Sequence, residues 1–131
     1  MTLDSKVDTA AAVAAKPTGF KRLYRALLYS RQGLMYAFRS EAAFRQEVAA
    51  ALLLIPLALV LGDSGMERAL LVTPVFAVLI VELLNSAIEA TVDRVGLERH
   101  TLAGVAKDMG SAAVALALGF WAVVWSLVLI G

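Results

Sequence analysis

The sequence predicts an all-α membrane protein, in which three transmembrane helices follow an amphipathic surface helix. Hydrophobic residues make up 60% of the 131 residues, too many for an ordinary soluble domain of this size. Apolar runs long enough to span a bilayer recur along the last two thirds of the chain. The chain has no Cys and one His, which excludes a disulfide framework, a thiolate nucleophile and a multi-histidine metal centre. Any metal must therefore be bound by carboxylates.

The N-terminal part divides into a tail and a surface helix. Residues 1–17 are small, polar and rich in Ala, and no apolar run with a cleavage site occurs there, so we expect a flexible tail rather than a signal peptide. Residues 18–131 are expected to form the membrane domain. Its first part, about 18–40, mixes aromatic and aliphatic residues with cations, as interfacial helices do, and Gly33 is expected to bend it.

The first two transmembrane helices are predicted at about 42–62 and about 67–92. Each contains a proline, Pro56 or Pro74, which membrane helices tolerate because neighbouring groups satisfy the freed carbonyl. We expect a kink at each proline, and a short polar turn between the two helices.

The third transmembrane helix is predicted at about 101–130, with Thr101 as its cap. Trp121 and Trp125 lie four residues apart on one face of it. Trp125 falls near the outer interface, where aromatic belts occur, but packing is the preferred interpretation for both side chains.

Basic residues predict the orientation of these helices. Eight of the 12 Lys and Arg residues precede residue 48, the first loop has Arg68, and the second connection has Arg94, Arg99 and Lys107. Because cytoplasmic segments carry the excess of Lys and Arg, the N-terminus and second loop are expected in the cytoplasm. The C-terminus is then periplasmic.

Polar residues form one narrow stripe on the second transmembrane helix: Glu82, Asn85, Ser86, Glu89 and Asp93. The opposite face is apolar, with Leu83, Leu84, Ala87, Ile88 and Val92. Ionisable groups at membrane depth cost a few kcal/mol each on low estimates, and usually face a bundle interior or a watery cavity. We interpret the stripe as the wall of an active site.

The depth of each acid suggests its chemistry. Glu89 lies near the water boundary, where it can meet a hydrated cation or a nucleotide phosphate. Glu82 lies deeper, where it can meet a lipid head group. Further charged residues start the first and third transmembrane helices: Glu41, Arg45 (i, i+4 from Glu41) and Glu47, and then Lys107, Asp108 and Ser111. Carboxylates of this kind suit Mg²⁺, which shares oxygen ligands with substrate phosphates. No glycine-rich nucleotide-binding motif occurs.

Several strings carry a family resemblance: TGF-x-R at 18–22, AxxYS ending at Ser30, EAAFRQE at 41–47, VE-x-LNSAIEA-x-VDR at 81–94 and AKDMGSAAV at 106–114. With these strings the chain resembles the small bacterial integral-membrane diacylglycerol kinases, over nearly everything from Thr18 onward. The resemblance implies an ATP- and Mg²⁺-dependent kinase of the inner membrane. It also implies a helical-bundle homotrimer with composite sites between subunits.

The resemblance implies roles for individual residues. Glu82 corresponds to the general base, Glu41 and Glu89 to the acids that bind metal and nucleotide, and Asn85 and Asp93 to supporting positions. The nucleotide-contacting positions are Arg22, Tyr29, Glu98, His100, Lys107 and Asp108. The positions near the lipid substrate are Ala26, Tyr29, Ser30, Arg31, Arg45, Glu82 and Ser111. Some members of the family have Trp where this chain has Arg31.

Two alternatives remain open on the sequence. One is the same chemistry on a polyisoprenol such as undecaprenol, although EAAFRQE and KDMGSAAV favour the glycerolipid branch. The other is a non-enzymatic membrane oligomer whose polar stripe lines a pore. The charged residues cluster toward one side, which argues against a continuous pore. Small residues on the last two helices predict an obligate oligomer in either case. No nucleic-acid partner is expected.

Overall fold

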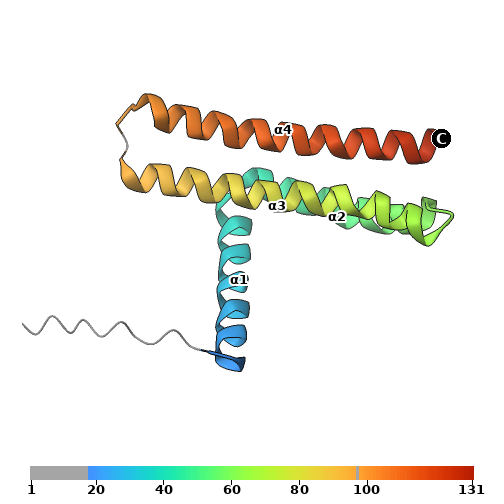
Figure 1. Ribbon diagram of the computed structural model, residues 1–131, viewed down its shortest axis with the longest axis horizontal. Coiled ribbons are helices and arrows are strands. Elements are labelled where there is room, and N and C mark those ends of the chain that lie inside the picture. The colour runs from blue at the N-terminus through green and yellow to red at the C-terminus, as the bar shows by residue number, and fades with distance from the viewer. Residues whose placement is uncertain (1–17, 97) are drawn as a thin grey trace, which may run out of the picture. The chain divides into compact units, whose positions relative to one another are not determined.

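A computed structural model describes residues 18–96 and 98–131, so the predicted tail lies outside the described residues. These ranges contain four helices: α1 (Phe20–Ser40), α2 (Ala42–Leu61), α3 (Gly65–Val95) and α4 (Thr101–Ile130) (Figure 1). Three of them, α2, α3 and α4, are long and apolar enough to cross a membrane. These helices confirm the predicted all-helical fold with three candidate membrane spans.

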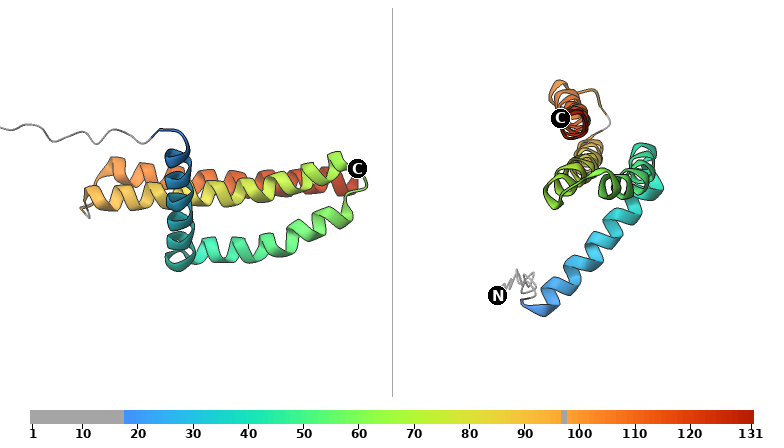
Figure 2. Two further views of the ribbon diagram at one scale, coloured as in Figure 1. Left: turned by 90° about the horizontal axis from the view of Figure 1, so that it is seen from below. Right: turned by 90° about the vertical axis from the view of Figure 1, so that its right-hand side faces the viewer.

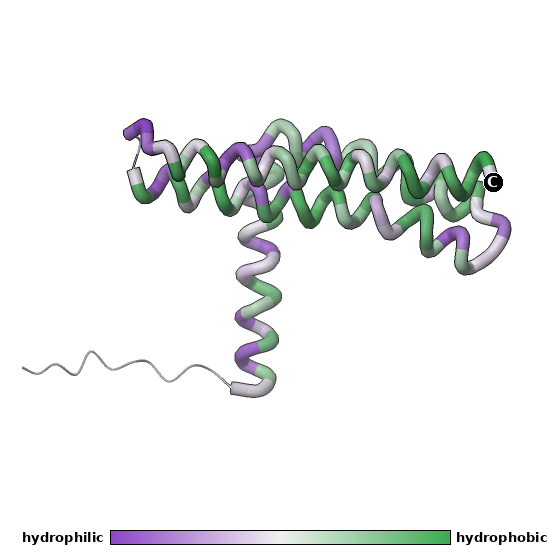
Figure 3. The backbone as a smooth tube through the Cα atoms, turned by 45° about the horizontal axis from the view of Figure 1, so that its top comes forward, coloured by the Kyte–Doolittle hydropathy of each residue, from purple (hydrophilic) through white to green (hydrophobic). Residues whose placement is uncertain are grey.

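The chain divides into two compact units after Leu34, inside α1, and each unit is described by itself. Helix α1 contains five basic residues and no acidic residue over Phe20–Ser40. Hydrophilic and hydrophobic residues alternate along it (Figure 3), and large apolar side chains such as Phe20 and Leu27 are exposed. The helix continues through Gly33 without interruption, so the expected bend does not break it.

In the unit from Met35 onward, α2, α3 and α4 run side by side, with α3 in contact with both neighbours (Figures 1 and 2). The core is made of Ala51, Ala58, Leu71, Val75 and Trp125. The Nε1 of Trp125 donates a hydrogen bond of 2.9 Å to the carbonyl oxygen of Leu71, which satisfies the indole and ties α4 to α3. The interpretation of Trp125 as a packing residue is confirmed, since its side chain is buried.

The ends of α3 and α4 are set by local caps. Ser64 accepts a hydrogen bond from the backbone N–H of Glu67, and the Glu67 carboxylate accepts one from the N–H of Asp63. This reciprocal capping starts α3 at Gly65, two residues before the predicted start. The expected cap at Thr101 is wrong: His100 is the N-cap of α4, because its Nδ1 accepts a hydrogen bond from the N–H of Leu102.

Hydropathy divides this unit along its length. Hydrophobic residues predominate along α2, α3 and α4, and hydrophilic residues gather where α3 connects to α4 (Figure 3). Both prolines lie inside continuous helices, and the ribbon of α2 curves along its length (Figure 2). The arrangement brings the later half of α3 and the start of α4 together at one hydrophilic end.

Candidate active site

Glu82 lies on the buried stripe of α3. The buried residues of this helix are Leu71, Pro74, Val75, Val78 and Glu82, whose spacing places them on one face. Glu82 is 5% exposed, and it is the one charged side chain buried in the part of the chain that the structure describes. A carboxylate is costly to bury, so its place in a membrane-spanning helix marks a candidate functional group.

The polar stripe becomes more exposed from Glu82 toward the end of α3. Asn85 and Glu89 are half-buried, and Asp93 is exposed. The Nδ2 of Asn85 donates a hydrogen bond of 3.2 Å to Oε1 of Glu89, which fixes the orientation of that carboxylate. The stripe therefore leads from a buried acid to a solvated one.

Gly110 of α4 lies directly against Asn85. A Cβ atom at Gly110 would collide with Oδ1 of Asn85 and would lie 3.3 Å from its Cγ. Oδ1 of Asn85 is buried and has no hydrogen-bond partner among the described residues. The absence of a side chain at Gly110 thus allows α4 to approach α3 at the level of the candidate site.

Two further carboxylates lie near Glu82. The charges of Glu41 and Glu89 both act on the Glu82 carboxyl group. Glu41 is the N-cap residue of α2, but its side chain makes no capping hydrogen bond, which leaves the carboxylate available. Acids gathered in this way repel one another, and a cation relieves the repulsion.

These acids fit Mg²⁺, which shares its ligands with phosphate and water, better than they fit a metal ion that the protein alone would enclose. Within residues 18–96 and 98–131, no group of three acidic or histidine side chains is close enough to enclose an ion. Mg²⁺ usually takes only one or two carboxylates and completes its shell with phosphate oxygens and water. Glu41 and Glu89 therefore fit a magnesium ion that takes its remaining ligands from outside the protein.

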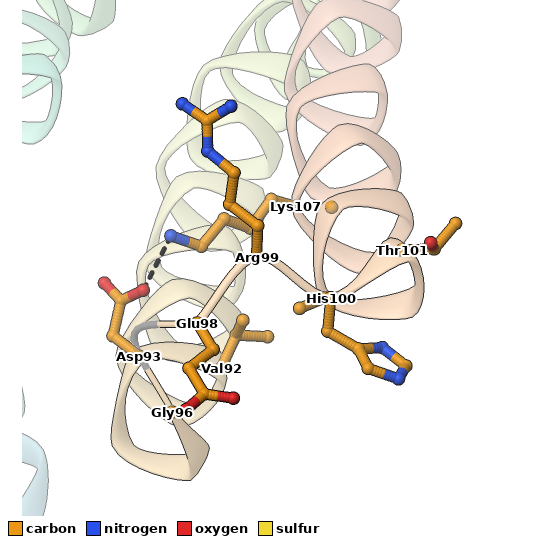
Figure 4. Close-up of a pocket in the computed structure, with 10 residues that line it drawn as sticks. Val92, Asp93, Gly96, Glu98, Arg99, His100, Thr101 and Lys107 are labelled. Atoms are coloured by element: carbon orange, nitrogen blue, oxygen red, sulfur yellow. Dashed lines mark hydrogen bonds and ion pairs between the residues drawn. The ribbon is translucent and has the colours of Figure 1, made fainter.

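A second group of charges lies where α3 connects to α4. Lys107 Nζ is 2.6 Å from Oδ1 of Asp93, and the two side chains are 41% and 52% exposed (Figure 4). They line a cavity of about 580 Å³ together with Glu98, Arg99 and His100. The ring of His100 points away from the ion pair. The structure thus brings together four predicted residues, Asp93, Glu98, His100 and Lys107, although His100 serves here as a helix cap.

Other predicted residues lie elsewhere. Arg45 does not pair with Glu41. Its Nη1 instead donates hydrogen bonds of 3.1 Å to the carbonyl oxygens of Phe38 and Arg39, at the end of α1. Asp108 and Ser111 are exposed on α4 and do not line the cavity.

The predicted residues of α1 belong to the unit that ends at Leu34. Arg22, Ala26 and Tyr29 follow i, i+4, i+7 spacing and share one face of the helix, with Ser30 beside them. Arg31 lies on the opposite face by the same spacing. All five are exposed, and their roles remain predictions.

Two further polar side chains are half-buried on different helices. Glu47 was expected among the carboxylates that suit Mg²⁺, and Trp121 was expected to be a packing residue. Oε2 of Glu47 and Nε1 of Trp121 are both buried without a partner among the described residues, and both side chains line one cavity. No spacing in the sequence connects them, because they lie on α2 and α4.

A buried acid, converging carboxylates and a charged cavity within a membrane-spanning helical unit define a class, that of a small integral membrane enzyme. A family model described as "Prokaryotic diacylglycerol kinase" matches residues 28–129. The chain belongs to the prokaryotic diacylglycerol kinase family. Together with its three long apolar helices, this membership indicates a bacterial membrane protein.

Relatives named "Diacylglycerol kinase" support the family over nearly the whole chain. The one from Pseudomonas aeruginosa is 56% identical over 114 residues, which are 87% of this chain and 93% of the relative. The one from Escherichia coli strain K12 is 50% identical over 117 residues, 89% of this chain and 96% of the relative. The one from Haemophilus influenzae is 49% identical over 110 residues, 84% and 93% of the two chains.

Proposed function

We propose that this protein transfers the γ-phosphoryl group of ATP to the free hydroxyl group of diacylglycerol, at a site built around Glu82. The product is phosphatidic acid and the leaving group is ADP. The observation that carries this proposal is the buried carboxylate of Glu82 on a membrane-spanning helix. Family membership supports a kinase that acts on diacylglycerol, rather than a non-enzymatic oligomer or a kinase for undecaprenol.

Glu82 would accept the proton of the lipid hydroxyl. At the same time the hydroxyl oxygen would bond to the γ-phosphorus, and the bond from that phosphorus to ADP would break. Positioned general bases contribute roughly 10² to 10⁴ in rate. Phosphoryl transfer otherwise depends on positioning and on neutralising charge, so little covalent help from the protein is needed. Asn85 supports this geometry because it holds the carboxylate of Glu89 one turn from its own position.

Glu41 and Glu89 would hold Mg²⁺, and Lys107 would contact the nucleotide phosphates. When bound, the magnesium ion would supply positive charge that offsets the charge of the phosphates. Lys107 already lies in the charged cavity, where Asp93 orients its ammonium group until phosphate competes for it. Arg22, Tyr29, Glu98, His100 and Asp108 are further proposed nucleotide contacts.

The lipid would approach at the depth of the interface. Helix α1 carries cations and exposed apolar side chains, which supports a place on the membrane surface as an amphipathic helix. Its Ala26, Tyr29, Ser30 and Arg31 would then lie near the lipid substrate, with Arg45 and Ser111. The basic N-terminal half supports a cytoplasmic site in the inner membrane and a periplasmic C-terminus.

We further propose a homotrimer with sites shared between subunits. Asp108 and Ser111 are exposed in one protomer, as expected of residues that complete the site of a neighbour. Exposed small residues on α3 and α4, such as Ala87, Ala90 and Ala112, allow close helix approach.

The test is a phosphorylation assay on purified protein with labelled ATP and either diacylglycerol or undecaprenol. We expect label in phosphatidic acid, and we expect Glu82→Gln to lower turnover at saturating substrate by at least about 100-fold without unfolding the protein. Glu67→Gln is the matched control, because it makes the same change in the first turn of α3, far along the helix from Glu82, and should leave turnover unchanged. Wild-type turnover in Glu82→Gln would remove Glu82 from the mechanism.

A further inference from the structure

The elbow between α1 and α2 is closed by a single arginine side chain. The two helices are separated by one residue, Glu41, whose backbone is extended (φ −105°, ψ 112°). Nη1 of Arg45, in the first turn of α2, donates hydrogen bonds of 3.1 Å to the carbonyl oxygens of Phe38 and Arg39. Arg45 therefore connects the start of α2 to the end of α1, across the residue that carries a proposed metal ligand.

These two hydrogen bonds replace bonds that the elbow removes. The last four carbonyl groups of a helix have no partner within it. The carbonyl oxygen of Ala37 accepts a hydrogen bond of 2.9 Å from the backbone N–H of Glu41. In a continuous helix the next two oxygens, those of Phe38 and Arg39, would accept from the N–H groups four residues later, which the extended residue turns away. A cation at a helix C-terminus also interacts favourably with the helix dipole, so Arg45 stabilises the elbow in two ways.

The position of the Glu41 carboxylate depends on this elbow. Glu41 is the N-cap residue of α2, but its side chain makes no capping hydrogen bond, so the backbone conformation sets the direction of the side chain. The charge of Glu41 acts on Glu82, which places the carboxylate on the side of the candidate site. All of these residues belong to the unit from Met35 onward. A change in the elbow would therefore move a proposed magnesium ligand relative to the site.

We propose that Arg45 is a positioning residue for Glu41: it holds the end of α1 against the start of α2, and so fixes the carboxylate where a divalent cation can bind with the nucleotide. The inference rests on the proposed function, which makes Glu41 a magnesium ligand. The role differs from the contact with lipid that is also proposed for Arg45. Loss of positioning weakens cation binding, whereas loss of a lipid contact raises KM for diacylglycerol and leaves cation binding unchanged.

The experiment measures cation binding directly. Mn²⁺, a paramagnetic substitute for Mg²⁺, is titrated into the full chain with an ATP analogue whose γ-phosphoryl group cannot be transferred, and free Mn²⁺ is followed by electron paramagnetic resonance. Removing a group that orients a metal ligand typically costs roughly 10-fold to 100-fold in metal affinity. Because Arg45 acts through the backbone, we expect Arg45→Ala to raise the dissociation constant for Mn²⁺ by about tenfold, at the low end of this range. Arg45 is exposed, so the change leaves the core intact.

A double variant separates positioning from other effects of the change. Glu41→Ala removes the ligand itself, so the further change Arg45→Ala should raise the dissociation constant no more. Arg39→Ala is the matched control. It removes an exposed cation from the same elbow but keeps the carbonyl oxygen that accepts from Arg45, so Mn²⁺ binding should remain that of the wild type.

Wild-type Mn²⁺ binding in Arg45→Ala overturns the inference, and an accompanying rise in KM for diacylglycerol would then assign Arg45 to the lipid alone. Unchanged binding in Glu41→Ala also overturns it, as does a further tenfold loss in the double variant or an equal loss in Arg39→Ala. In each of these cases, phosphorylation of diacylglycerol by the wild type leaves the proposed function standing. A wild type that does not phosphorylate diacylglycerol overturns the proposed function itself, and the inference with it.

Discussion

Replacing Gly110 with Ala is expected to disturb the active site without changing any acidic side chain. The added Cβ would collide with Oδ1 of Asn85 and lie 3.3 Å from its Cγ and 3.9 Å from its Cα. Either α4 moves away from α3, or the amide of Asn85 turns. A turned amide loses the hydrogen bond that Asn85 donates to Glu89.

Both responses have a measurable size. Inserting a methyl group into a packed interior typically costs about 1 to 3 kcal/mol of stability. A displacement of about 1 Å at catalytic groups can lower turnover by roughly 100-fold. We therefore expect Gly110→Ala to unfold at a lower fraction of denaturing detergent and to lose between tenfold and 100-fold in kcat/KM for lipid phosphorylation.

Gly119→Ala is the control, on the same helix. Its Cβ would meet no atom within 4 Å, and Ala stabilises a helix interior relative to Gly by up to about 1 kcal/mol. This variant should be as active and at least as stable as the wild type. In an Asn85→Ala background the collision is absent, so Gly110→Ala should then have little further effect on stability. Wild-type stability and activity in Gly110→Ala would refute the reasoning.

Three further predictions concern the charged residues. Glu89→Ala and Glu41→Ala should each raise the Mg²⁺ concentration needed for half-maximal activity at fixed ATP, because each removes a proposed oxygen ligand; unchanged titrations in both would contradict the metal role. Asp93→Asn should change stability little, since the side chains of its ion pair are about half exposed, whereas Lys107→Ala should lower turnover strongly; wild-type turnover in Lys107→Ala would contradict the phosphate role of Lys107. Mixed oligomers of Glu82→Gln and Lys107→Ala should regain activity if the two residues serve one site from different chains. Co-assembly that is verified but restores no activity would place both residues in the site of one chain.

Helical periodicity predicted the fold and the polar stripe because it is a local property. Spacing of i, i+3, i+4 and i+7 alone placed Glu82, Asn85 and Glu89 on one face of α3, and the structure leaves them buried or half-buried. The same spacing also places Leu71 and Val78 on this face, but it could not show that the face is buried within the protomer. The boundaries of α3 moved by two or three residues, because caps at Ser64 and Gly96 extend the helix.

Contacts between helices could not be predicted, because they depend on how the helices are rotated against one another. The ion pair between Lys107 and Asp93 joins α4 to α3, and no local spacing in the sequence indicated it. The contact of Gly110 with Asn85 fixes the relative depth of α3 and α4, yet Gly110 appeared in the sequence only as one small residue among several.

The gradient of burial along α3 explains how two unlike substrates can meet in so small a protein. Asp93 is exposed beside the charged cavity, Glu89 is half-buried, and Glu82 is buried about 10 Å further along the helix. On the proposed mechanism, a nucleotide would remain at the exposed end while a lipid hydroxyl would remain at membrane depth, and neither would have to leave its own medium. Glu82 is 5% exposed, so on the proposed mechanism little water would compete with the lipid hydroxyl as the phosphoryl acceptor. Burial within the helices would then exclude water in the way that a closing lid does in soluble kinases.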